Sequence, residues 1–203
     1  MIVVDIEAAG LDPKKSALLS IGAVDFKNPE RQFYVEAQIW EGSTIDPDSL
    51  EVNGFTEEQC RDPKKETLEE VMHKFINWMR LAQEKTLMGQ NPSFDRDFLN
   101  ASFGRCGISW GFSYRTLDLH TLAYTDCLQK GISIPIENGR TSLNLDSILA
   151  YVGVPKEPKP HNALMGAKCE AEAFSRILYG KNLLPEFSQY PVPEIFIKKE
   201  KES

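Results

Sequence analysis

Apolar residues recur in three short segments near the start of the chain, in the pattern of strands that bury at least one face. These segments are residues 2–7, 18–26 and 32–39. Residues 12–15 and 27–30 contain proline and several polar side chains, which predicts turns between the strands. Because such short links join neighbouring strands that run in opposite directions, the first part of the chain is predicted to form an antiparallel sheet.

From residue 67 onward the apolar residues follow the period of helices that bury one side. Thr67 is predicted to cap the first long helix, at 67–83, with Glu70 completing a capping box. Ser93 and Ser142 are predicted to begin two later helices. The remaining elements are predicted at 86–89 and 112–117 for strands and at 93–105, 118–129, 143–152 and 162–179 for helices. This order predicts an α/β fold with a mixed sheet.

Length and composition narrow the class of protein. With 203 residues the chain is long enough for one domain, predicted over 1–182, followed by a tail over 183–203. A net charge of −7 argues against a broad basic surface for duplex nucleic acid, although an enzyme of strand ends needs only local positive charge. The four cysteines form no Cys-x-x-Cys pair, which predicts reduced thiols. Without a visible signal peptide or membrane segment, a cytoplasmic protein is expected.

Two acidic residues, Asp5 and Glu7, interrupt the apolar run of the first strand. Side chains two residues apart on a strand point to the same face, so both carboxylates can reach one ion. Burying unpaired charge there would cost several kcal/mol, which a divalent cation offsets. The other interpretation is an edge strand whose acids face water.

Two further segments carry residue types that a metal-dependent phosphodiesterase needs, at 90–99 and at 161–168. With Asp5-x-Glu7-x-x-Gly10, Asn91-x-x-Phe94-Asp95 and His161-x-Ala163, the chain resembles the DEDDh exonucleases from about residue 2 to 180. This resemblance implies a ribonuclease H-like fold with three layers, in which helices flank a five-stranded mixed sheet.

Gly166 departs from the family pattern, because members of the family carry their fourth acid five residues after the histidine. Three accounts are open: fewer metal ions, a protein that binds without catalysis, or another acid in place of the missing one. Glu170 is the best substitute, since it lies one helical turn further on the same face, although a turn rises about 5.4 Å.

The resemblance assigns roles to individual side chains. It implies two Mg²⁺ or Mn²⁺ ions held by the carboxylates of Asp5, Glu7, Asp95 and Glu170. Glu7 would also orient the attacking water. His161 is the implied general base. Contacts to the substrate are expected from Ala8, Leu11, Phe55 and Asn91, the last of which also suits a turn.

These residues favour a metal-dependent 3′→5′ exonuclease that releases nucleoside monophosphates from single-stranded DNA or RNA. The alternative is a nucleic-acid-binding module of the same fold, catalytically weakened or inactive because of Gly166. A third possibility is that the chain is an engineered or inactivated variant whose parent carried aspartate at the position of Gly166. The family also implies partners that the sequence leaves open, namely a polymerase or repair protein, or a second copy of this chain.

Overall fold

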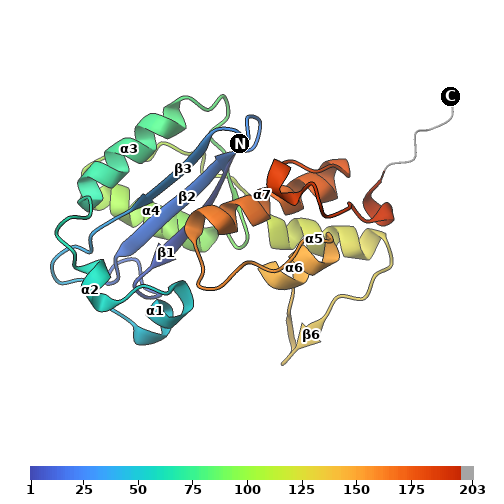
Figure 1. Ribbon diagram of the computed structural model, residues 1–203, viewed down its shortest axis with the longest axis horizontal. Coiled ribbons are helices and arrows are strands. Elements are labelled where there is room, and N and C mark those ends of the chain that lie inside the picture. Colours follow the sequence, from blue (N-terminus) through green and yellow to red (C-terminus); the bar gives the residue numbers. More distant parts are fainter. Residues whose placement is uncertain (198–203) are drawn as a thin grey trace.

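A five-stranded sheet forms the centre of the computed structural model, which describes residues 1–197 (Figure 1). Its strand order is β3-β2-β1-β4-β5, with the first three antiparallel and with β4 and β5 parallel to β1. The strands are β1 (Ile2–Ala8), β2 (Leu18–Asp25), β3 (Gln32–Glu36), β4 (Leu87–Gly89) and β5 (Thr116–Asp118). Residues 198–203 of the predicted tail lie outside the described residues.

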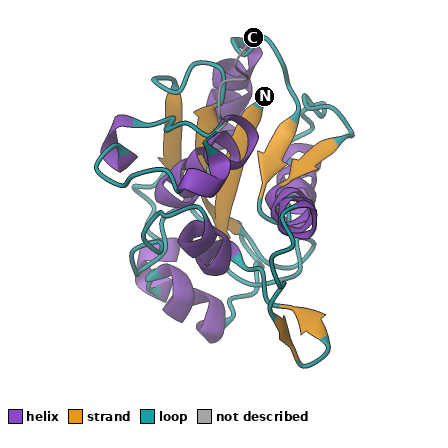
Figure 2. Cartoon of the chain, turned by 90° about the vertical axis from the view of Figure 1, so that its right-hand side faces the viewer, coloured by secondary structure: helices purple, strands orange, loops and turns teal. Residues whose placement is uncertain are grey.

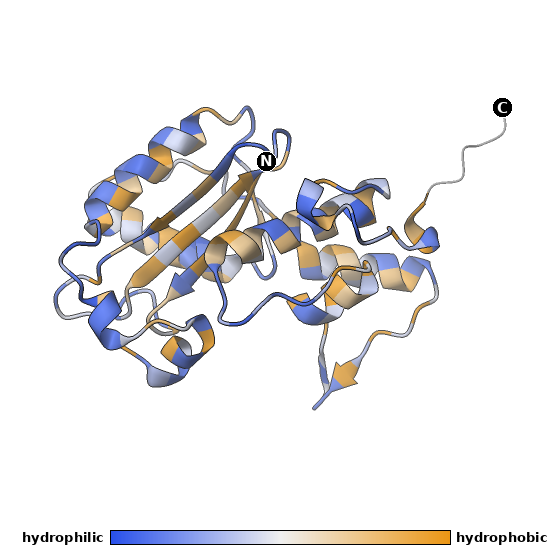
Figure 3. Cartoon of the chain, in the orientation of Figure 1, coloured by the Kyte–Doolittle hydropathy of each residue, from blue (hydrophilic) through white to orange (hydrophobic). Residues whose placement is uncertain are grey.

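Helices cover both faces of this sheet (Figures 1 and 2). On one face, Ile2, Val4 and Ile6 pack in a core with α3 (Leu68–Arg80) and α4 (Ser93–Arg105). The opposite face packs against α5 (Leu119–Gln129), α6 (Leu145–Tyr151) and α7 (Ala163–Tyr179). Figure 3 shows the result, with apolar strands inside and polar residues on the outer sides of the helices. The predicted α/β fold with a mixed sheet of five strands is confirmed.

Helix starts agree with the sequence only in part. Thr67 and Glu70 form the predicted capping box of α3. Ser93 does not cap α4, because Asn91 takes a left-handed conformation (φ 54°) and Pro92 occupies the cap position. The prediction for Ser142 was also wrong: Asn144 caps α6, and its side chain accepts a hydrogen bond from the Ser147 amide at 2.9 Å.

Several short elements were absent from the sequence prediction. They are α1 (Pro47–Asn53), α2 (Glu57–Cys60), the 3₁₀ helices η1 (Pro185–Phe187) and η2 (Glu194–Phe196), and the strands β6 (Ile136–Glu137) and β7 (Arg140–Thr141). The two strands form a hairpin that projects from the body (Figure 2). Asn138 and Gly139 turn it with φ of 50° and 73°, so the Asn-Gly pair was a hairpin signal that the prediction passed over.

The segment that follows α7 packs onto the second core. Leu184, Phe187 and Phe196 are buried there. Arg176, fully buried in α7, donates hydrogen bonds to the carbonyls of Phe187 and Tyr190. The described part of the predicted tail therefore contributes to the same core as the helices, and the division of the chain at residue 182 stays a prediction.

Two expectations from composition concern the thiols and the membrane. Cys60, Cys106, Cys127 and Cys169 are all free thiols in the structure. Among residues 1–197, no helix combines the length and the apolar character needed to cross a bilayer.

Candidate active site

A cleft of about 500 Å³ brings most of the predicted catalytic residues together. It lies where β1 and β4 end and where α4 and α7 begin. Of the predicted residues, six line it: Asp5, Glu7, Asn91, Asp95, His161 and Glu170. Segments far apart in the sequence thus meet at one end of the sheet.

Asp5 and Glu7 project from the face of β1 that α7 covers. In β1 they alternate with Val4 and Ile6, which are buried in the opposite core. Asp5 pairs with Gly22 of β2, and a Cβ added at Gly22 would overlap the backbone of Ala163. The glycine therefore permits the first turn of α7 to lie directly on the sheet, beside the acids of β1.

Gly166 of α7 lies directly beside the Asp5 side chain. A Cβ added at this residue would overlap the Oδ2 atom of Asp5. The place next to the sheet that a side chain at residue 166 would fill is therefore taken by the Asp5 carboxylate itself. Residue 166 can carry a side chain only if the Asp5 carboxylate moves away.

Introducing a side chain at residue 166 is expected to destabilise the protein. For Gly166→Ala we expect a loss of about 1–3 kcal/mol in the free energy of unfolding, because Asp5 must move from a tightly packed place. Gly166→Asp is expected to lose at least as much and not to raise nuclease activity. Urea denaturation and a nuclease assay measure the two effects.

Gly104 in α4 is the matched control, since a Cβ added there meets no atom within 4 Å. Gly104→Ala is expected to stabilise the protein by about 0.5–1 kcal/mol. Equal effects of alanine at the two positions, or a more active Gly166→Asp variant, would contradict the packing account.

Glu170 and Asp95 complete the group of buried acids. Both side chains are 4% exposed. Asp95 Oδ1 accepts a hydrogen bond from the Ile6 amide at 3.1 Å, and Glu170 Oε1 accepts one from the Gln90 amide at 3.1 Å. The other oxygen of Glu170, Oε2, is buried without a hydrogen-bond partner among the described residues.

Burial raises the pKa of all four carboxyls, and repulsion from neighbouring acids adds to the effect at Asp5, Glu7 and Glu170. Burial in the cleft raises the pKa of Asp5 and of Glu170 well above the ordinary range, with the neighbouring acids adding to the effect. Burial likewise raises the pKa of Glu7 to about 8 and that of Asp95 to about 7. Within residues 1–197 none of the four forms an ion pair. The protein thus concentrates acidic groups without supplying their counter-charge.

Divalent cations match this donor set in chemistry. Carboxylate oxygens are the ligands that Mg²⁺ and Mn²⁺ prefer. The unpartnered Oε2 of Glu170 is free to coordinate such an ion. In their present positions, no three acidic, histidine or cysteine side chains of the described residues come close enough together to hold a metal ion. Binding therefore requires these side chains to rotate toward the ion.

The perturbed acids predict how metal-free stability depends on pH. Their folded-state pKa values lie above the unfolded values of about 4, so unfolding releases protons. Stability of the metal-free protein is therefore expected to fall as the pH rises from about 4 to about 8, by about 1.4 kcal/mol per pH unit for each proton released.

Thermal melts in a chelator, at a series of pH values, measure this slope. Added Mn²⁺ is expected to raise the melting temperature most at the alkaline end, and Glu7→Gln is expected to flatten the curve. A melting temperature that stays constant or rises over this range in the chelator would contradict the prediction.

His161 lies at the mouth of the cleft, with 35% of its side chain exposed. Its amide donates to the Val52 carbonyl at 3.3 Å, and the next residue, Asn162, caps α7 by accepting from the Leu164 and Met165 amides. These contacts fix the backbone on both sides of the imidazole. The predicted position of His161, between a proline-rich loop and the last long helix, agrees with the structure.

Of the four residues predicted to contact the substrate, only Asn91 lines the cleft. Leu11 is 75% exposed and, like Ala8 and Phe55, does not line the cleft. The Ala8 carbonyl accepts a hydrogen bond from Asn53, and Phe55 lies under the Lys65 ammonium at 4.4 Å. Asn91 reaches the cleft, but its left-handed backbone forms the turn before α4. The expected contacts to the substrate stay predictions.

The structure also adds a residue that sequence reasoning missed. Glu157 comes from the proline-rich loop before His161, and its buried carboxylate faces the same cleft. An acid between two prolines, four residues before the histidine, was the available signal.

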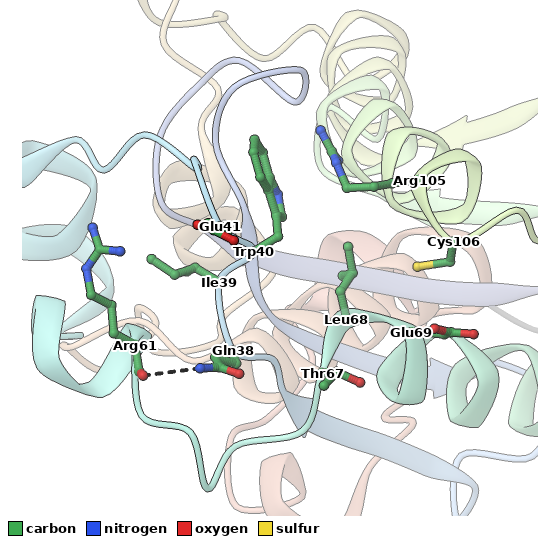
Figure 4. Close-up of a pocket in the computed structure, with 10 residues that line it drawn as sticks. All are labelled: Gln38, Ile39, Trp40, Glu41, Arg61, Thr67, Leu68, Glu69, Arg105 and Cys106. Atoms are coloured by element: carbon green, nitrogen blue, oxygen red, sulfur yellow. Dashed lines mark hydrogen bonds between the residues drawn. The ribbon is translucent and has the colours of Figure 1, made fainter.

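A second cavity, of about 550 Å³, holds none of the predicted catalytic residues (Figure 4). Its walls include Trp40, whose ring lies 4.2 Å from the Arg105 guanidinium, and the side chain of Arg61. The acids Glu41 and Glu69 balance these cations. The acidic cleft is therefore the candidate active site.

Comparisons with known proteins show the family to which the chain is similar. A model of the RNase_T family, described as exonuclease, matches residues 2–174. The chain is 27% identical over 178 residues to a PolC-type DNA polymerase III of Thermotoga maritima, covering 87% of this chain and 12% of that protein. It is 28% identical over 214 residues to ribonuclease T of Marinobacter nauticus, covering 98% and 90% of the two chains.

Solved structures share the fold. Exonuclease I of E. coli in complex with a dA16 oligonucleotide matches with a TM-score of 0.70 at 17% identity, over 89% of this chain and 40% of that chain. The nuclease domain of 3′hExo, a DEDDh family member bound to rAMP, matches with a TM-score of 0.67 at 18% identity, over 90% and 93% of the two chains.

Proposed function

The chain belongs to the exonuclease family, and we propose that it is a metal-dependent 3′→5′ exonuclease acting on single-stranded DNA or RNA. In this reaction a water molecule attacks the terminal phosphodiester, and a nucleoside monophosphate leaves. The observation that carries the proposal is the cleft that gathers Asp5, Glu7, Asp95 and Glu170, of which the last three are buried, without any cationic partner among the described residues.

Each acid has a proposed role. Asp5, Glu7, Asp95 and Glu170 would hold the Mg²⁺ or Mn²⁺ ions through their carboxylates. When bound, the ions stabilise the charge that develops on the phosphate and favour ionisation of the attacking water. Glu7 would also orient that water. The buried and unpartnered Oε2 atom of Glu170 supports its proposed role as a metal ligand.

His161 is the proposed general base. Its side chain borders the cleft beside Glu7 and is accessible to a nucleotide that enters. In the neutral form, its imidazole can accept a proton from the attacking water.

The substrate side of the proposal draws on the walls of the cleft and on the relatives. Phe94 and Lys159 line the cleft, where an aromatic ring and an ammonium suit a base and a phosphate. Structural neighbours were solved with single-stranded oligonucleotides, which supports a strand end as substrate. Similarity to part of a PolC-type polymerase supports action beside a polymerase or repair enzyme, and a homodimer stays a prediction.

The alternative of an inactive binding module has less support. Its starting observation was the missing acid at Gly166, and Glu170 supplies another acid to the same cleft. The family assignment points to catalysis and gives the alternative no support.

Incubation with 5′-labelled single-stranded DNA and RNA, in Mn²⁺ and in chelator, tests the proposal. We expect a ladder of products shortened from the 3′ end, together with nucleoside monophosphates, only when the metal is present. Internal cleavage, or a ladder that persists in chelator, would overturn it. Intact substrate in the presence of bound Mn²⁺ would favour the binding module instead.

A further inference from the structure

Glu157 is an unusual loop residue, because its side chain is only 5% exposed. It lies in the loop between α6 and α7, among Pro155, Pro158 and Pro160. A carboxylate in a loop ordinarily points into water, and burying it costs free energy unless it makes specific contacts. The contacts of Glu157 therefore indicate what it does.

Both oxygens of Glu157 face the residues at the start of α7. Oε1 accepts a hydrogen bond from the Asn162 amide at 3.2 Å. Oε2 lies 3.8 Å from Nδ1 of His161, which is within ion-pair range and longer than a hydrogen bond. Among the described residues, no other acid lies within ion-pair distance of His161.

The backbone holds both partners. Three prolines fix φ in the loop that carries Glu157, and His161 is anchored through its amide to the Val52 carbonyl. The Asn162 cap ties the same segment to α7. Both side chains are thus carried by a fixed main chain, with Oε2 and Nδ1 3.8 Å apart.

We infer that Glu157 is the positioning residue of His161, an inference that rests on the proposed exonuclease function. Its carboxylate accepts the Nδ1–H bond, which selects the tautomer with an unprotonated Nε2. The attacking water then gives a proton to Nε2 as its oxygen bonds to phosphorus and the bond from phosphorus to the 3′ oxygen breaks. Glu157 stays ionised and stabilises the imidazolium, as carboxylates do beside a histidine base.

The test reads the tautomer directly, in the metal-free full-length chain. The chain has three histidines, so His161 can be assigned in ¹⁵N-labelled protein by comparison with a His161→Gln variant. In spectra of the neutral imidazole we expect ring couplings of the Nδ1–H form. In Glu157→Ala the signal should move toward the Nε2–H form.

Kinetics give a second measurement. Glu157→Gln keeps an acceptor for Nδ1–H but loses the charge, so kcat is expected to fall about 10–100-fold while KM and the number of bound Mn²⁺ ions stay unchanged. Glu69 and His73 form the matched exposed pair, at 3.9 Å on α3, and Glu69→Ala is expected to leave kcat unchanged.

Each outcome decides the question. An unchanged His161 tautomer in Glu157→Ala would overturn the inference. Fewer Mn²⁺ ions in Glu157→Gln would also overturn it, because Glu157 would then be a metal ligand. A tautomer that responds in a chain without nuclease activity would support the Glu157–His161 pair while the proposed function fails, so the two failures are distinguishable.

Discussion

Exchange of Glu7 for glutamine is expected to lower the rate of nucleotide release by about 10³-fold or more. Glutamine has nearly the same shape, so the change removes a charge and leaves the packing of β1 intact. If the Glu7 carboxylate holds an ion and orients the water, its loss removes about 4 kcal/mol of transition-state stabilisation.

The folded protein should tolerate this change well. Burial raises the pKa of Glu7 to about 8, so the charged form is disfavoured in the metal-free state and a neutral amide relieves that cost. We expect the melting temperature of metal-free Glu7→Gln to equal or exceed that of the unmodified chain at alkaline pH. Loss of activity could not then be attributed to unfolding.

Single-turnover assays with saturating Mn²⁺ measure the rate, and calorimetric titration measures the bound ions. Asp97→Asn is the control, because Asp97 lies on the exposed side of α4 and pairs with Arg96. Its activity is expected to match that of the unmodified chain. A Glu7→Gln variant within about 10-fold of the unmodified rate would contradict the assigned role, since the missing charge would then be worth less than about 1.4 kcal/mol.

Replacing Arg176 with methionine is expected to cost about 3–5 kcal/mol of unfolding free energy. Arg176 and Glu172 are both fully buried in α7 and form an ion pair at 2.7 Å. The guanidinium also donates to carbonyls in two segments, including Val152 after α6 and Tyr190 in the C-terminal segment. Methionine would fill part of the volume but leave Glu172 as a buried, unpaired charge.

The same change should loosen the C-terminal segment. Glu172 Oε2 accepts hydrogen bonds from the Leu183 and Leu184 amides, so the ion pair connects this segment to α7 from both partners. Urea denaturation measures the stability, and limited proteolysis reports early cleavage within residues 182–197. Loss of the segment is expected to precede global unfolding.

Arg61 and Glu57 form the matched control, since they have the same four-residue spacing at 2.9 Å but are more than half exposed. Arg61→Met is expected to cost less than about 1 kcal/mol, because exposed pairs are screened by water. Similar costs for the two arginines would show that burial of the Glu172–Arg176 pair does not matter.

Local chemistry determined much of the fold from the sequence. The apolar runs at β1 and β2 and the helical spacing of α3 are strong patterns, because the two strands are buried on both faces and α3 buries one face against a core. Short turns determined the antiparallel pairing of the first strands. The alternation of side chains along β1 was also sufficient to place Asp5 and Glu7 on one face.

Caps and short elements were less predictable. Ser142 and Asn144 are equally good capping residues in isolation, and the tertiary position of the loop selects Asn144. Short helices such as α1 carry too few residues for a periodic pattern. The C-terminal segment was predicted only as a tail, because its prolines interrupt any periodic pattern, but the buried guanidinium of Arg176 donates hydrogen bonds to its carbonyls.

The sequence by itself predicted which residues would carry the chemistry: the acids of the first strand, Asp95 after the fourth, and His161 before the last helix. Only the tertiary structure decided how they meet. Gly22 lets the start of α7 lie against the sheet, and Glu170 of the same helix reaches the cleft. Glu157 reaches the same cleft from the loop between α6 and α7. These arrangements depend on contacts between distant segments, and spacing along one element cannot report them.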